Sequence, residues 1–307
     1  FSPVIYSKQV QLAFRKASVC EAITNSDYFG EIANMGDSVK IIKEPEITVQ
    51  AYSRGTTITP QDLDDEDFSL TIDKANYFAF KVDDIEEAHS HVNFQSLASD
   101  RAAYRLGDQF DQDVLGYLTG FKQSATHGSP DTVNTTTNGS VAVSTAGTDE
   151  LLSSMKIDAA AFGGSAGASL ALQPRTGGAT DSTPAAGDTF PLTVIARMSR
   201  LLDQQNVDTQ GRWLVVDPVF MELLKDEDSR LFNADFGGSG LQNGQVGTNI
   251  HGFRVYTSNN LPTVGTGPSF TGTNSTTNYG MIVAGHDSAV ATAEQINKTE
   301  TYRDPDS

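Results

Sequence analysis

Apolar and polar residues alternate along two early stretches of the chain, on either side of a long polar loop. The apolar positions are Val39, Ile41, Ile47 and Val49 in the first stretch, and Phe68, Leu70 and Ile72 in the second. A period of two is typical of half-exposed strands, and Pro45 favours an edge or a kink in the first. The pattern predicts a long two-stranded hairpin with few apolar residues near it, followed by a third strand over 77–82.

A helical period follows the hairpin. Asp83 and the acidic residues after it predict a helix start, because carboxylates favour the positive end of a helix. Apolar residues then recur at steps of three and four from Phe94 to Phe121. This predicts a helix roughly 42 Å long at about 1.5 Å per residue. Residues 1–36 carry only a short helical pattern, and we interpret this segment as an N-terminal arm.

The second half of the chain predicts a unit of short strands and helices. A continuous apolar run predicts a strand over Arg212–Val216, and two further strands are predicted over 252–256 and 281–284. Asp188 with Pro191 predicts the start of a helix that ends near Gln205, and Asp217 predicts the cap of a helix over 219–225. Residues 123–189 are rich in Gly, Ser, Thr, Ala and Asn, so we expect a loop or a loosely built insertion there, with one short helix over 151–157.

Composition narrows the classes of partner. The 307 residues include 39 acidic and 21 basic side chains, which gives a formal charge of −18. Such a chain repels nucleic acid and anionic membranes, because phosphate binding needs a positive surface. No run of 18 apolar residues occurs, so no membrane span is predicted. Cys20 is the only cysteine, so an intrachain disulfide is impossible, and we expect this thiol to be buried.

Three motifs could carry chemistry, and each has a simpler interpretation. Ser165 lies in a G-x-S-x-G pattern but lacks the preceding strand that a serine nucleophile needs. His89 and His91 are two residues apart, whereas a metal pair on a helix needs a spacing of four. The acidic run from Asp62 to Asp67 lacks the glycine and the closing glutamate of a calcium loop. We therefore predict no catalytic, cofactor or metal site and no enzyme, while a secreted hydrolase using Ser165 and a Thr/Asn-rich adhesin stay as alternatives.

Three stretches carry a resemblance to a known family. They are Gly36–Glu87, a strand, loop and strand before "KVDDIEEA" and the long helix; Arg212–Phe232, "RWLVVDPVFMELLKDEDSRLF"; and Asn243–Pro262, "NGQVGTNIHGFRVYTSNNLP". In this order they resemble the major capsid (coat) proteins of tailed bacteriophages, which have the Hong Kong 97-type fold. The final "AGHDSAVATAEQINKTETYRDPD" is also similar.

The resemblance implies an α+β fold of the Hong Kong 97 type. By this resemblance, residues 1–36 form an N-terminal arm and residues 37–82 an extended loop hairpin. Residues 83–122 begin the peripheral domain with its long spine helix, residues 123–265 form the axial domain with a Gly/Ser/Thr-rich insertion, and residues 266–307 return to the peripheral domain.

The same resemblance implies a structural role. Copies of the chain would self-assemble into the pentamers and hexamers of an icosahedral phage head, which encloses double-stranded DNA without sequence-specific binding. The protein would assemble in the host bacterial cytoplasm and reside in the virion, with scaffolding, portal or cement proteins left open as further partners. A shell protein of a cellular nanocompartment with the same fold is the nearest alternative. The hairpin residues expected at the subunit interface are Tyr52, Arg54, Thr57, Ile58, Asp64 and Asp65.

Overall fold

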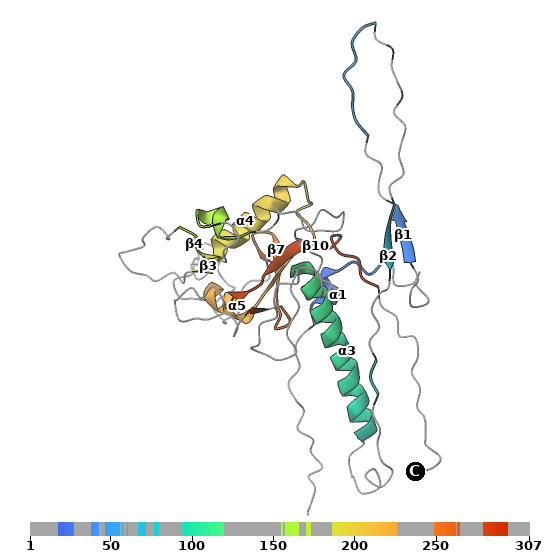
Figure 1. The fold of residues 1–307 in the computed structure, drawn as a ribbon, viewed down its shortest axis with the longest axis vertical. Coiled ribbons are helices and arrows are strands. Elements are labelled where there is room, and N and C mark those ends of the chain that lie inside the picture. The colour runs from blue at the N-terminus through green and yellow to red at the C-terminus, as the bar shows by residue number, and fades with distance from the viewer. Residues whose placement is uncertain are drawn as a thin grey trace, which may run out of the picture.

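A computed structural model gives the fold (Figure 1). It describes residues 18–27, 38–42, 47–55, 57, 60, 67–71, 77–79, 94–119, 155, 157–165, 170–172, 186–225, 249–261, 263–264 and 279–293. The predicted helix start at Asp83, the motif histidines and the acidic run 62–66 lie outside these residues, as does most of the predicted helix 151–157.

A four-stranded mixed sheet forms the centre of the described structure, with the strand order β10-β5-β7-β6. Its members are β5 (Arg212–Val216), β6 (Asn249–Ile250), β7 (Phe253–Thr257) and β10 (Val283–His286). Strand β5 runs parallel to β7 and antiparallel to β10. All five residues of β5 are buried, which explains its apolar run Trp213–Val216, because a strand covered on both faces needs apolar side chains on both.

One face of the sheet is covered by the helices α4 (Pro191–Gln204) and α5 (Pro218–Leu224). Alternate β5 residues, Leu214 and Val216, point to this face and share an apolar cluster with Ile195 of α4 and Phe220 of α5. The predicted strand Arg212–Val216 and the predicted helix after Asp217 are therefore confirmed.

The other face is covered by α1 (Cys20–Ile23) and the C-terminal part of α3 (Phe94–Thr119). Trp213 and Val215 of β5 point to this face and pack with Cys20, Ile23 and Leu115. The long predicted helix is confirmed to within two residues of its end. The short helix near the N-terminus contributes three fully or nearly buried residues to this core, Val19, Cys20 and Ile23.

The predicted hairpin is present as an antiparallel pair of β1 (Ser38–Ile42) and β2 (Asp67–Thr71), with Ser38 opposite Thr71 and Ile42 opposite Asp67. The first strand does not reach the predicted positions 47–49, because among the described residues β2 pairs with Ser38–Ile42. Residues 47–55 form neither helix nor strand, and neither do residues 77–79, where a strand was predicted. In Figure 1 the pair stands to one side of the central sheet.

Smaller elements complete the described structure. They are the 3-10 helix η2 (Ala159–Phe162) and the strands β3 (Ala171–Leu172), β4 (Asp188–Thr189), β8 (Thr263–Val264) and β9 (Tyr279–Gly280). Strand β3 pairs with β4 in parallel, and β8 pairs with β9 antiparallel.

Two sequence predictions are wrong in detail. Asp188 does not cap α4, because it belongs to β4; the helix begins at Pro191 after Phe190, whose side chain makes no capping hydrogen bond. The last strand of the central sheet runs from Val283 to His286 rather than from Met281 to Ala284. In the observed strand Gly285 lies opposite the large indole of Trp213. Glycine has no side chain, so the apolar pattern used for the prediction ended before it.

Candidate subunit interface

The segment Ile47–Gly55 is exposed at every residue. Its three large apolar side chains are mostly open to solvent, with exposed fractions of 68% for Ile47, 93% for Val49 and 68% for Tyr52. In Figure 1 this blue segment lies beyond the β1–β2 pair, far from the central sheet. Burial of one such side chain contributes roughly 1.5–3 kcal/mol, so this segment, called the arm below, presents apolar surface that a binding partner could cover.

The residues expected at the interface fall in and after the arm. Tyr52, Arg54 and Thr57 are all exposed. Arg54 and Gly55 form a turn in which Gly55 has a φ of 97°, a left-handed conformation that favours glycine. Ile58, Asp64 and Asp65 lie outside the described residues. All six remain predictions.

A second exposed aromatic segment, Tyr77–Ala79, follows the hairpin in the sequence. The side chain of Tyr77 is 90% exposed and that of Phe78 is 46% exposed. In Figure 1 this segment lies on the opposite side of the β1–β2 pair from the arm. The described chain therefore exposes large apolar side chains at both ends of the hairpin, which is unusual for a subunit that acts alone.

A buried carboxylate joins the N-terminal segment to the rest of the chain. Asp111, on α3, has no exposed surface. Its Oδ1 accepts hydrogen bonds from the backbone N–H groups of Val19 and Cys20, at 3.0 and 2.9 Å, and from the Ser18 hydroxyl at 3.1 Å. These backbone groups belong to the N-terminal end of α1, where N–H groups lack partners within the helix. A side chain from another helix therefore caps α1.

The second oxygen of the same carboxylate binds the turn that follows β7. Asp111 Oδ2 accepts from Asn260 Nδ2 at 2.9 Å and lies 3.5 Å from the Ser258 hydroxyl. The same amide nitrogen of Asn260 donates to Asp108 Oδ1, also at 2.9 Å. Both acids and Asn260 are buried, so one amide and two carboxylates connect α1, α3 and the end of β7. We call these residues, with Ser258, the junction.

A further contact holds the N-terminal segment from its other end. Asn25 forms an isolated parallel bridge with Ala291. The Asn25 N–H donates to Val290 O at 2.8 Å, and the Thr292 N–H donates to Asn25 O at 3.0 Å. The Thr292 hydroxyl also lies 3.0 Å from that of Thr24. Residues 18–27 are thus fixed by α3 at one end and by the segment after β10 at the other.

Sequence reasoning missed the junction. Asp108 and Asp111 lie on a helix with many polar residues, and an acidic helical residue is usually exposed. A partial signal was present, because the two acids are spaced i and i+3 among apolar positions that face the core. The Ser-Asn-Asn-Leu-Pro sequence contributes to the family resemblance, and the structure gives its Ser258 and Asn260 a physical role as donors to the buried carboxylates.

The candidate reactive groups do not assemble into a catalytic site within the described residues. Ser165 is exposed and follows the 3-10 helix η2, which ends at Gly163 in a left-handed conformation; a strained turn after a strand is not formed there. Burial, with a smaller effect from the neighbouring Asp111, raises the pKa of the Cys20 thiol, so this thiol is a poor nucleophile.

The described residues were also compared with the requirements of a metal site and of a membrane-spanning helix. No group of three His, Cys, Asp or Glu side chains in the described part of the chain is arranged to hold a metal ion. None of the helices that the structure describes is both long and apolar enough to cross a membrane.

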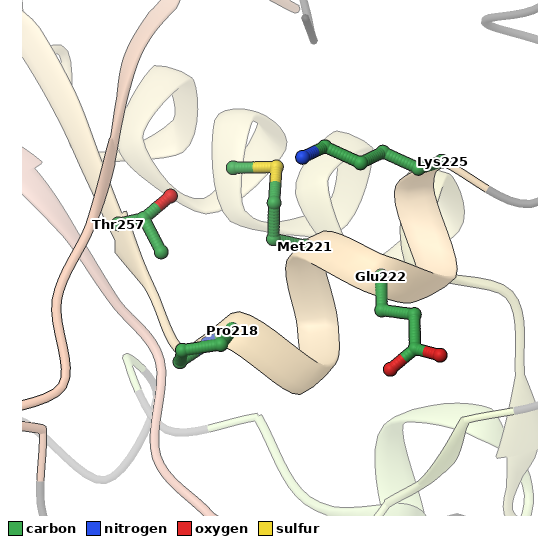
Figure 2. Close-up of a pocket in the computed structure, with 5 residues that line it drawn as sticks. All are labelled: Pro218, Met221, Glu222, Lys225 and Thr257. Atoms are coloured by element: carbon green, nitrogen blue, oxygen red, sulfur yellow. The ribbon is translucent and has the colours of Figure 1, made fainter. Parts of the chain in front are cut away.

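A shallow hollow lies on the surface beside α5 (Figure 2). It is lined by Pro218, Met221, Glu222, Lys225 and Thr257. In Figure 2 the Lys225 ammonium extends toward Met221, while the Glu222 carboxylate points away from it. These side chains do not converge on one point, so the hollow lacks the set of polar groups that fixes a small ligand.

Comparison with solved structures relates this architecture to phage particles. A structure from Mycobacterium phage Che8 is similar over 100% of this chain and 88% of its own, with a TM-score of 0.64 and 23% identity. A capsid structure of cyanophage P-SCSP1u is similar over 90% of this chain and 73% of its own, with a TM-score of 0.52 and 20% identity. For the mature capsid of bacteriophage PhiM1 the shares are 94% and 78%, the TM-score is 0.53 and the identity is 12%.

The chain therefore has the fold of phage major capsid proteins, and the predicted resemblance is confirmed at the level of the fold. No protein-family model and no curated protein matches the sequence. At these identities the similarity lies in the three-dimensional arrangement. The order of the elements along the sequence indicated this arrangement, whereas no single motif was sufficient to indicate it.

Proposed function

We propose that this protein is a structural shell subunit that self-assembles into the pentamers and hexamers of an icosahedral phage head. The head would enclose double-stranded DNA, and the protein would reside in the virion after assembly in the host bacterial cytoplasm. The capsid fold supports this proposal, and the exposed arm is the single observation that carries it. A chain that places Val49 and Tyr52 in solvent gains stability when a neighbouring copy covers them.

The proposal includes the Hong Kong 97-type subdivision of the chain. Residues 1–36 would be the N-terminal arm, 37–82 the extended loop and 83–122 the peripheral domain with α3 as its spine helix. Residues 123–265 would form the axial domain and 266–307 would return to the peripheral domain. Scaffolding, portal and cement proteins would be partners of the shell rather than of one subunit.

In this proposal the extended loop lies on an adjacent subunit and contacts it through Tyr52, Arg54, Thr57, Ile58, Asp64 and Asp65. Each contact is modest, but a closed shell repeats it in every subunit, so the sum stabilises the particle. The net charge of −18 supports a wall that repels packaged DNA rather than binding it. The role is structural, with no reaction catalysed.

The arm can be tested without disturbing the core. In the variant Val49→Ser with Tyr52→Ser, the side chains that change are already exposed, so we expect a soluble subunit with the parent unfolding midpoint. Closed shells, counted by electron microscopy and sedimentation, should fall at least tenfold. Gln204→Ser with Gln205→Ser, at the exposed end of α4, is the control and should assemble as the parent does.

Replacement of residues 50–66 by a short Gly/Ser turn is the stronger form of the test. Loop closure contributes only about 0.6 kcal/mol per doubling of loop length, so the subunit should still fold. Normal shells from this variant would refute the role of the loop. A parent protein that forms no closed particle would refute the shell function, and native particles holding protein cargo instead of DNA would identify a nanocompartment.

A further inference from the structure

Two exposed surfaces of the subunit have complementary chemistry but lie far apart in the same chain. One is the arm, Ile47–Gly55, and the other is the hollow beside α5. In Figure 1 the arm lies beyond the β1–β2 pair, whereas α5 lies on the side of the central sheet that faces away from this pair. A contact between the two surfaces therefore requires two copies of the chain.

The hollow has an apolar floor that the core holds in place. Met221 is half-buried and packs against the apolar cluster that contains Phe220 and Leu224. Pro218 and Thr257, both exposed, line the hollow beside it. The volume is about 360 Å³, near the lower end for ligand pockets in proteins, so the hollow suits one large side chain.

The residues around this floor favour an aromatic ring with a polar tip. A methionine sulfur makes favourable contacts with aromatic rings, and a lysine ammonium is attracted to the face of a ring. In Figure 2 the Lys225 ammonium extends toward Met221, so both groups can contact one ring. The Thr257 hydroxyl can form a hydrogen bond with a phenol hydroxyl. Tyr52, 68% exposed on the arm, supplies both the ring and the hydroxyl.

The charges next to these groups also match. Within the described part of the chain, neither Arg54 nor Glu222 forms an ion pair, and both are exposed. Glu222 follows Met221 on α5, and its carboxylate points away from the hollow in Figure 2. Arg54 follows Tyr52 by two residues, so a ring in the hollow brings the guanidinium near this carboxylate, a partner that arginine binds through two parallel hydrogen bonds.

We propose that the hollow beside α5 is the docking site for the arm of a neighbouring copy. The Tyr52 ring lies against Met221 and Lys225, and the Arg54 guanidinium lies beside Glu222. The inference rests on the proposed function for the existence of an assembly, and it names the surface of the neighbour that the arm covers.

The contact has a direction, because the arm and the hollow are different surfaces. Each copy gives its arm to one neighbour and receives the arm of another, which is a heterologous interface. Contacts of this kind form closed rings when the rotation between neighbouring copies closes. A ring is the arrangement that the pentamers and hexamers of the proposed function require.

The test traps the contact between two different copies. One copy carries Ala51→Cys, next to the proposed anchor, and the other carries Thr257→Cys, in the hollow. Both positions are exposed, and both copies carry Cys20→Ala, which removes the only natural thiol. Copies mixed before assembly and oxidised afterwards should give disulfide-linked dimers on a denaturing gel. Each variant alone should give at least about tenfold less dimer, because a heterologous contact does not bring identical surfaces together.

Charge reversal tests the pairing of Arg54 with Glu222. Arg54→Glu in the first copy, or Glu222→Arg in the second, places like charges opposite each other across the interface. Because this is strongly unfavourable, each change should lower the yield of linked dimer at least about tenfold. The two changes together restore an opposite pair and should recover the yield. Such recovery requires contact between these two residues and is not expected from a change in folding.

A matched pair of variants tests the anchor. Tyr52→Ser in the first copy should lower the yield at least about tenfold, as truncation of an aromatic anchor does in other interfaces. Tyr77→Ser is the control. It removes a more exposed tyrosine at the other end of the hairpin and should leave the yield unchanged.

The outcomes separate the docking site from the proposed function. Closed shells without the mixed disulfide would overturn the docking site and leave the shell function standing. Equal linkage by Ala51→Cys alone, or charge reversals that do not recover when combined, would also overturn it. Mixed disulfides in a protein that forms no closed particle would support the docking site and refute the shell function.

Discussion

The contact between Gly285 and Trp213 allows us to predict the sign and the size of the change in the free energy of unfolding when Gly285 is replaced by alanine. Gly285 lies opposite Trp213 in the pairing of β10 with β5. A Cβ placed on Gly285 would lie 2.6 Å from Cζ2 of the indole, with two further ring atoms at 3.0 and 3.1 Å. Trp213 is 1% exposed and packs against Cys20, Ile23 and Leu115, so the ring has little room to move.

We expect Gly285→Ala to lower the free energy of unfolding by about 1–3 kcal/mol, the usual cost of overpacking a filled core. A decrease of this size should be visible in urea or guanidinium unfolding of the unassembled subunit as a lower midpoint with an unchanged slope. Trp213→Ala removes the whole indole and should cost about 3–5 kcal/mol.

The double variant Trp213→Phe with Gly285→Ala isolates the clash between the new methyl group and the indole ring. With Trp213→Phe in place, the ring atoms nearest to the new methyl group are gone, so Gly285→Ala should cost less than it does in the parent. The difference is the coupling energy, expected at about 0.5–3 kcal/mol for residues in contact. Gly107→Ala on α3 is the matched control: its new Cβ meets no atom within 4 Å, and the change should stabilise the helix by up to about 1 kcal/mol. Additive effects, or a neutral Gly285→Ala, would refute the packing argument.

Two further predictions concern polar groups at the ends of β5. Burial raises the pKa of Asp217, whose carboxylate caps α5 by accepting from the Phe220 N–H at 3.0 Å. The folded state therefore holds its proton to a higher pH than the unfolded state does, so this group lowers the free energy of unfolding as pH rises above its ordinary pKa. Asp217→Asn should keep the cap and lose this pH dependence, whereas Asp217→Ala should cost about 1 kcal/mol; identical pH profiles of wild type and Asp217→Asn would contradict the assignment. Arg212, 2% exposed, donates to the backbone oxygens of Asp208 and Val207 and to the Asp203 carboxylate, each at 2.7 Å. Lysine cannot span these acceptors, so Arg212→Lys should lower the free energy of unfolding by about 3 kcal/mol, and the exposed Arg200→Lys on α4 should be neutral in the same denaturation experiment.

The sequence determined those elements whose apolar pattern or capping residue can be recognised from a few neighbouring residues. Arg212–Val216 was predicted with its observed bounds, because a strand covered on both faces needs a continuous apolar run. Helix α3 was predicted because its apolar residues keep one period over 26 residues. The cap at Asp217 was predicted because its chemistry involves residues only three positions apart.

The tertiary structure decided what depends on residues far apart in the chain. Asp111 is buried only because its donors come from residues 91 to 93 positions before it and 147 to 149 positions after it, and no local pattern records such a distance. The same holds for Gly285, where the space for the Trp213 indole exists only once β10 lies beside β5. The arm shows the opposite case: its alternating apolar residues predicted a strand, but a strand forms only where a partner offers hydrogen bonds, and among the described residues β2 pairs with Ser38–Ile42 and not with residues 47–55.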